Sequence, residues 1–154
     1  MKRGFTLVEL LAVIILLGIV ATITTPIILN FINSSKTNAL LDDANSLIKI
    51  SETYYSENTY NNESLIPVKI TFASHNQTAK GLNKQNVCTS KSNILNYGGE
   101  SPETGNILIT SDGKITLYIY NSGLKKCAYK GPNDKTAKIV NKTKDECQIT
   151  TDVC

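Results

Sequence analysis

Tryptophan is absent from this 154-residue chain, and histidine occurs once, as His75. A single histidine cannot build a multi-histidine metal centre. The four cysteines include no pair at the CxxC spacing of a zinc site. No glycine-rich phosphate loop, serine–histidine arrangement or nucleophile elbow is present either. The sequence therefore gives no support to an enzyme, a cofactor or a metal site.

Charged residues are few and nearly balanced. The chain has 16 basic and 13 acidic residues, and its net charge of +3 does not by itself indicate a nucleic-acid partner. Seven lysines lie between Lys125 and Lys144, but acidic residues interrupt or follow the run: Asp134, Asp145 and Glu146. A solvated face is the expected interpretation, with DNA binding as a weakly supported alternative. Asp112-Gly113 is interpreted as a turn, because too few oxygen ligands lie nearby for a calcium site.

One long apolar segment stands out near the N-terminus. From Leu10 to Leu29, twenty residues carry no charge. A helix rises about 1.5 Å per residue, so this segment can span a bilayer core of roughly 30 Å. Lys2 and Arg3 precede it and the next charge is Lys36, which favours a cytoplasmic N-terminus and an exported C-terminal part.

A cleaved secretory signal is the first alternative for this segment. The apolar region of such a signal usually has about 7–15 residues and ends in a small-residue cleavage site. Here the run is longer, Val20-Ala-Thr22 is a poor site, and Pro26 and the apolar residues 27–29 continue past it. A membrane-spanning helix is therefore the preferred prediction.

Glu9 is the informative residue at the start of the span. A carboxylate in hydrocarbon costs on the order of a few kcal/mol and usually has a partner. One interpretation places Glu9 at the level of the lipid headgroups, facing water. The other requires a nearby cation, which a free α-amino group at Phe5 would supply if the chain were cleaved before that residue.

The run Lys2-Arg-Gly4 followed by Phe5-Thr-Leu-Val-Glu-Leu10 resembles the processing site of type IV prepilins and pseudopilins. The resemblance is most specific over residues 3–31. It implies cleavage after Gly4 by a prepilin peptidase, N-methylation of Phe5, and a role for Glu9 in neutralising the N-terminus of an adjacent subunit. It also implies a cytoplasmic motor ATPase and platform proteins as assembly partners.

Gly18 and Pro26 match helix-weakening positions in many pilins, and the resemblance implies that the helix melts locally between them in a filament. The simpler interpretation is that glycine and proline are tolerated in membrane helices. Pro26 removes the donor that would bond the carbonyl group of Thr22. The hydroxyl groups of Thr22, Thr24 and Thr25 are placed to compensate.

The helical period continues after polar residues begin at Asn30, to about residues 57–60. The apolar side chains of this half lie within about 100° of Leu40 on a helical wheel: Leu41, Ala44, Leu47, Ile48, Ile50, Tyr54 and Tyr55. Most polar side chains lie opposite: Asp42, Asn45, Lys49, Glu52 and Ser56. The pattern predicts an amphipathic helix that packs on a sheet.

The remaining chain predicts a small β-rich head. Alternation indicates strands at residues 68–72, 106–110 and 114–120, with a further strand at 125–129 and a short edge strand at 138–140. Residues 75–92 are interpreted as polar and irregular. The expected fold class is α+β: a long N-terminal helix packed on an antiparallel sheet of three or four strands.

Four cysteines, confined to the C-terminal half, indicate a disulfide framework if the head leaves the cytoplasm. Three pairings are possible, and spacing alone does not choose between them. We favour Cys127–Cys147 and Cys88–Cys154, because Cys127–Cys147 would attach the polar segment 141–146 to a predicted strand. A local Cys147–Cys154 link is the main competitor.

The sequence thus predicts four segments. Residues 1–4 form a cleaved leader, 5–31 a hydrophobic membrane and filament-core helix, 32–60 its amphipathic continuation, and 61–154 a disulfide-bonded head. The predicted function is that of a structural subunit of a type IV pilus or pseudopilus, assembled with copies of itself and other pilins. It would be stored as a single-pass membrane protein and then displayed in a cell-surface filament. The alternative is a membrane-anchored adhesin or DNA-uptake binding protein that does not polymerise.

Overall fold

The computed structural model describes residues 6–59, 65–98 and 101–154. It contains one helix, α1, and seven strands, in an order that places the helix first. Their bounds are α1 Leu7–Asn58, β1 Val68–Ala73, β2 Asn76–Leu82, β3 Cys88–Ser92, β4 Thr104–Ile109, β5 Ile115–Asn121, β6 Lys126–Lys130 and β7 Lys138–Val140. The chain divides into two compact units, residues 1–36 and 37–154, which are described separately.

The first unit contains the apolar half of α1. Its large apolar side chains, from Leu7 to Ile32, expose between 39% and 81% of their surface. Among the described residues, Val87 is the one exposed large apolar side chain outside this stretch. By length and composition α1 can cross a membrane. The exposed apolar surface therefore needs a partner other than water, as the sequence predicted.

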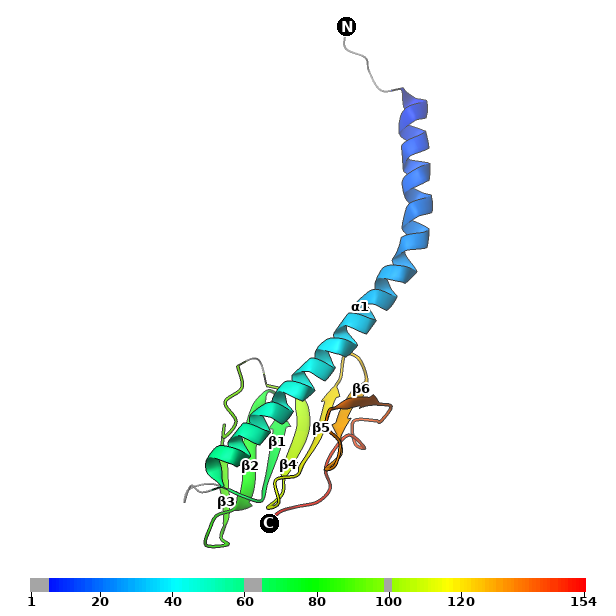
Figure 1. The fold of residues 1–154 in the computed structure, drawn as a ribbon. Helices are drawn as coiled ribbons and strands as arrows, with labels where there is room; N and C mark the ends of the chain where they lie inside the picture. The colour runs from blue at the N-terminus through cyan, green and yellow to red at the C-terminus, as the bar shows by residue number, and fades with distance from the viewer. Residues whose placement is uncertain (1–5, 60–64, 99–100) are drawn as a thin grey trace. The chain divides into compact units, whose positions relative to one another are not determined.

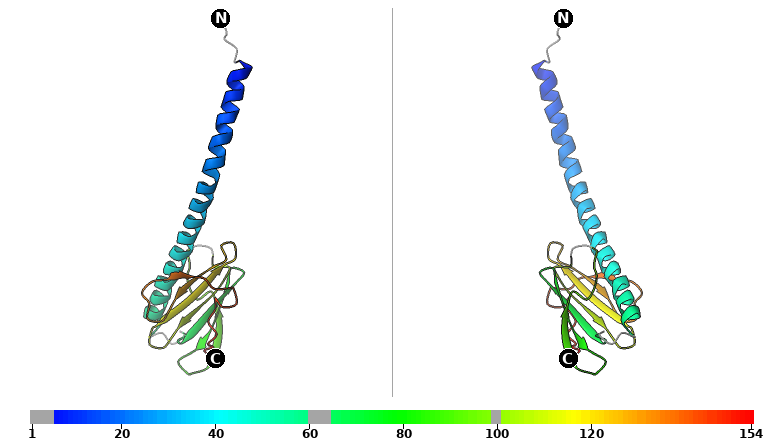
Figure 2. Two further views of the ribbon diagram at one scale, coloured as in Figure 1. Left: turned by 90° about the vertical axis from the view of Figure 1, so that its right-hand side faces the viewer. Right: turned by 90° about the vertical axis from the view of Figure 1, so that its left-hand side faces the viewer.

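The second unit is a seven-stranded antiparallel sheet with the C-terminal half of α1 along one face (Figures 1 and 2). The strand order is β3-β2-β1-β4-β5-β6-β7. Residues 93–103 lead from β3, at one edge of the sheet, back to β4, on the far side of β1. All other connections are between neighbouring strands.

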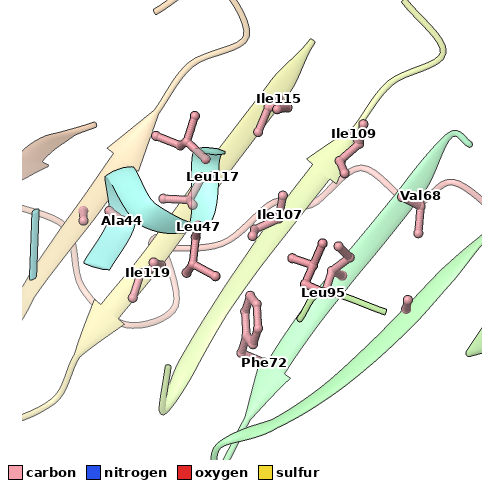
Figure 3. Close-up of a cluster of buried hydrophobic side chains, with 14 of the residues drawn as sticks. Ala44, Leu47, Val68, Phe72, Leu95, Ile107, Ile109, Ile115, Leu117 and Ile119 are labelled. Carbon is pink, nitrogen blue, oxygen red and sulfur yellow. The ribbon is translucent and has the colours of Figure 1, made fainter. Parts of the chain in front are cut away.

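The core lies between α1 and the sheet (Figure 3). In β1 and β5 alternate side chains are buried, as expected for strands with one face against a helix. The helix contributes side chains at the spacing of one helical face, of which Ala44 and Leu47 are fully buried. The predicted amphipathic face of the helix is confirmed by its buried residues: Leu40, Ala44, Leu47, Ile48 and Ser51.

The predicted fold class is confirmed, but the number of strands was wrong. The sheet has seven strands where three or four were expected. Residues 75–92, interpreted as irregular, contain β2 and β3. The buried positions of β2 are Gln77, Ala79 and Gly81, so this strand alternates in burial without alternating in hydrophobicity. Most of the edge strand β3 is exposed, which permits its polar sequence.

Candidate functional site

The helix α1 begins at a pair of side chains that bond each other's backbone. The Thr6 backbone N–H donates to Glu9 Oε2 at 2.9 Å, and the Thr6 hydroxyl donates to the same oxygen at 2.8 Å. In return the Glu9 N–H donates to the Thr6 hydroxyl oxygen at 3.3 Å. This is a capping box, with Thr6 as the N-cap and Glu9 at the third helical position.

The capping box fixes the Glu9 carboxylate at the first turn of a helix whose other side chains there are apolar. Glu9 itself is exposed. The unpaired N–H groups and dipole of a helix start favour a negative charge at this position. The carboxylate is thus placed where a cation from outside the helix can reach it.

The predicted cleavage residues Gly4 and Phe5 lie outside the described residues. Phe5 directly precedes Thr6. Thr6, which holds the Glu9 carboxylate, would therefore be the second residue of the cleaved chain. Thr6 was not singled out from the sequence. The pattern Thr6-Leu-Val-Glu9 before an apolar run is the signal that would have identified it.

The predicted helix-weakening residues, Gly18 and Pro26, both lie inside α1. A Cβ atom added at Gly18 would meet nothing within 4 Å. The three threonine hydroxyls bond carbonyl groups in the turn before Pro26: Thr22 to Ile19, Thr24 to Val20 and Thr25 to Ala21, at 2.7, 3.0 and 2.7 Å. They therefore satisfy the hydroxyl groups within the helix, and none of these bonds reaches the carbonyl of Thr22, which was the expected acceptor.

The head contains two disulfides, Cys88–Cys154 and Cys127–Cys147, which is the pairing favoured from the sequence. Cys127 lies in β6 and Cys88 begins β3, so the two bridges attach residues 147–154 to strands far apart in the sheet. Among the described residues no group of three or more His, Cys, Asp or Glu is placed to hold a metal ion.

Asp112, in the turn between β4 and β5, serves the turn itself. Its carboxylate accepts a hydrogen bond from the Thr110 hydroxyl and forms an ion pair with Lys114 Nζ at 2.8 Å. Hydrogen bonding to Lys114, then to Thr110, lowers the pKa of Asp112 to about 2. The carboxylate thus has partners from within its own turn.

The lysine-rich segment is also engaged within the head. Lys130 is buried and donates to the carbonyl of Ile115 at 2.7 Å, while Lys126 donates to the Thr37 hydroxyl at 3.1 Å. Lys138 lies 5.6 Å from the ring centroid of Tyr129, and Lys142 lies 5.0 Å from that of Tyr118. These four lysines therefore have contacts inside the head, whereas Lys125, Lys135 and Lys144 of the same segment are exposed.

Comparison with known protein families finds one match, over residues 1–25, to the prokaryotic N-terminal methylation motif. The matched residues include the capping box and the start of the apolar helix. Comparisons with curated proteins and with solved structures find no match.

Proposed function

We propose that this protein, which its prepilin-type methylation motif marks as a member of the type IV pilin and pseudopilin family, is a filament subunit stored in the membrane. The family's proteins are normally structural and not enzymes. In this proposal a prepilin peptidase removes residues 1–4, Phe5 is methylated, and the apolar helices of many subunits pack into a fibre. The heads then form the outer surface of the filament.

The single observation that carries the proposal is the presence of the Thr6–Glu9 capping box at the start of an exposed apolar helix. Cleavage before Phe5 creates an ammonium group one residue from Thr6. In an apolar environment a buried ammonium and a buried carboxylate are each costly alone, and pairing them offsets much of that cost. The N-terminus of one subunit and Glu9 of its neighbour are complementary groups of this kind.

The apolar half of α1 supplies the second argument. A bilayer covers this surface while the subunit is stored, which is consistent with membrane anchoring. Other apolar helices cover it equally well in a fibre core, because helix packing restores close contact between side chains. Transfer between the two environments therefore needs no change in the head. The assembly platform and motor ATPase expected of the family would drive it.

The test is the chemical form of the protein in sheared extracellular material. Mass spectrometry should find a mature chain that lacks residues 1–4 and carries one additional methyl group on Phe5. Electron microscopy of the same material should show filaments that disappear when the protein is deleted. An intact Met1 in surface material would refute the proposal, and a processed chain that never leaves the membrane would favour the non-polymerising adhesin.

Glu9→Gln tests the proposed assembly role separately. The variant should insert into the membrane normally, because removing a charge favours the apolar phase. Its filament yield should fall, since the neighbouring ammonium loses its partner. Glu57→Gln, which removes an exposed charge near the other end of α1, is the matched control and should assemble normally. Equal yields from both variants would favour the placement of Glu9 among the headgroups.

A further inference from the structure

The last eight residues, Cys147–Cys154, cross the sheet as a strap. At one end Cys147 is bonded to Cys127 in β6, and at the other Cys154 is bonded to Cys88 in β3. Between them the Ile149 N–H donates to Asn106 Oδ1 of β4 at 3.4 Å, and Asp152 pairs with Lys69 of β1 at 2.8 Å. The strap therefore contacts β6, β4, β1 and β3 in turn, which is their order across the sheet.

The strap lies on the face of the sheet opposite α1. Val68, Ile70 and Phe72 of β1 belong to the core under the helix, so Lys69, which alternates with them, points to the other face. A second small group of buried side chains lies there, outside the core under α1: Cys127, Cys147 and Ile149.

The strap is short for the width of sheet that it crosses. From β6 to β3 there are five intervals between neighbouring strands, which at about 4.8 Å each amount to roughly 24 Å. Eight residues contain seven Cα–Cα steps, which span about 23–25 Å when fully extended. With a bridge of 5.9 Å between Cα atoms at each end, a segment of this length crosses from β6 to β3 by an extended path.

The first part of the connection from β3 to β4 lies on the opposite side of the sheet, over β2. Leu95 of this connection is buried in the core under α1 (Figure 3). The side chain of Gln77, in β2, donates to the Leu95 carbonyl at 3.0 Å and accepts from its N–H at 2.8 Å. The connection thus runs over the α1-facing side of β2 before the chain reaches β4.

We infer that the two disulfides close a covalent ring through which the β1–β2 hairpin passes. The ring follows residues 88–127, crosses the Cys127–Cys147 bridge, continues through residues 147–154 and returns by Cys154–Cys88. Residues 94–97 of the β3–β4 connection lie over the α1-facing side of the hairpin, and the strap crosses its other face. Its strands cannot be lifted from the sheet in either direction while the ring is closed.

Because both disulfides are needed to close the ring, their effects on the unfolding rate should not be independent. Breaking either bridge opens the ring completely, so the second break has little left to release. Two independent cross-links behave differently, because each restricts its own loop of the unfolded chain and their effects add. The sequence separations of 66 and 20 would then also give the Cys88–Cys154 bridge the larger effect.

The test measures unfolding rates of the full mature chain in detergent micelles. All seven tyrosines lie between Tyr54 and Tyr129, so tyrosine fluorescence reports on the head. The double variants Cys88→Ser/Cys154→Ser and Cys127→Ser/Cys147→Ser should each unfold at least roughly tenfold faster than wild type. The quadruple variant should unfold at nearly the same rate as either double variant. Additive increases in the logarithm of the rate, or no increase from one pair, would overturn the ring.

A second experiment leaves all four cysteines in place, in case a serine variant does not fold. An inserted protease site at the exposed residues 122–123 cuts the ring, whereas one at the exposed residues 132–133 cuts the chain outside it. After cleavage, the chain cut at 122–123 should unfold at least roughly tenfold faster than the chain cut at 132–133. Equal unfolding rates for the two cut chains would refute the threaded arrangement.

Discussion

At the scale of single residues, the start of α1 depends on a reciprocal pair rather than on Glu9 alone. Thr6 donates two hydrogen bonds to one oxygen of Glu9, which holds the carboxylate in a defined position within the chain itself. Preorganisation of this kind reduces the entropy lost when the carboxylate binds a cation. The proposed assembly contact therefore includes a residue that does not itself carry charge.

Thr6→Val should reduce filament yield, because it removes the hydroxyl that both caps the helix and holds Glu9. Loss of an N-cap typically costs about 1 kcal/mol of helix stability. Thr6→Ser keeps the hydroxyl and should assemble like wild type. Yield is measured in sheared material, and mass spectrometry must show that each variant is still cleaved. Normal yield from a fully processed Thr6→Val chain would contradict the positioning role.

The stability of the head should depend on Asp112 in acid. The pKa of Asp112 is lowered to about 2 in the folded head, against an ordinary value of 3.8. Its stabilising contribution is therefore present above about pH 4 and is lost as the pH falls toward 2. Asp112→Asn should be less stable than wild type at pH 6 and equally stable at pH 2. The difference at pH 6 should be small, because the group is exposed. Urea denaturation across this pH range measures the difference, with Asp42→Asn as the charge control.

At the scale of elements, β2 shows why some strands escape sequence analysis. Its buried positions include Gly81, where an added Cβ would lie 2.6 Å from the Pro67 carbonyl oxygen and 2.9 Å from Leu65 Cβ. The strand is glycine-containing because neighbouring chain passes so close, and this reason is invisible in the local sequence. By contrast β5 was predicted correctly, since its alternating β-branched and aromatic residues match its alternating burial.

Gly81→Ala should destabilise the head by about 1–3 kcal/mol, the usual range for overpacking a filled core. The contacts are with backbone and with Cβ atoms, which cannot move aside as the end of a flexible side chain can. Gly98→Ala is the matched control, because an added Cβ there meets nothing within 4 Å. It should change stability by less than about 0.5 kcal/mol. Urea denaturation followed by tyrosine fluorescence measures the stability of each variant. Equal losses of stability in the two variants would contradict the close approach at Gly81.

The same distinction applies to the candidate sites. Gly4, Phe5 and Glu9 could be predicted as site residues because they form one short motif, and Thr6 could have been added from the capping pattern. The strap could not be recognised, because its partners Asn106 and Lys69 are 43 and 83 residues distant from it in the sequence. Only the order of strands in the sheet brings Asn106 and Lys69 under the strap.

At the scale of the whole molecule, α1 belongs to two units with different surfaces. Up to Lys36 its side chains form a unit with an apolar surface, while Leu40 to Ser51 complete the core of the head. One helix therefore links a part that we propose to assemble to a part that folds on its own core. The boundary between these tasks lies within a continuous element, so a change on one side should leave the other intact.

A chain that begins at Thr37 should therefore fold without the apolar half of α1. It retains every residue of the core cluster and both disulfides. A chain that begins at Glu52 should fail to fold, because it lacks Leu40, Leu47 and Ile48. Truncating a buried Leu or Ile to Ala typically costs about 2–5 kcal/mol. Three such losses match the roughly 5–15 kcal/mol by which a domain is stable.

Both fragments are made in an oxidising compartment and compared by thermal unfolding and size-exclusion chromatography. A cooperative transition in the Thr37 fragment alone is the expected result. Aggregation of the Thr37 fragment, or a folded Glu52 fragment, would show that the head does not depend on this part of α1 in the way its core indicates.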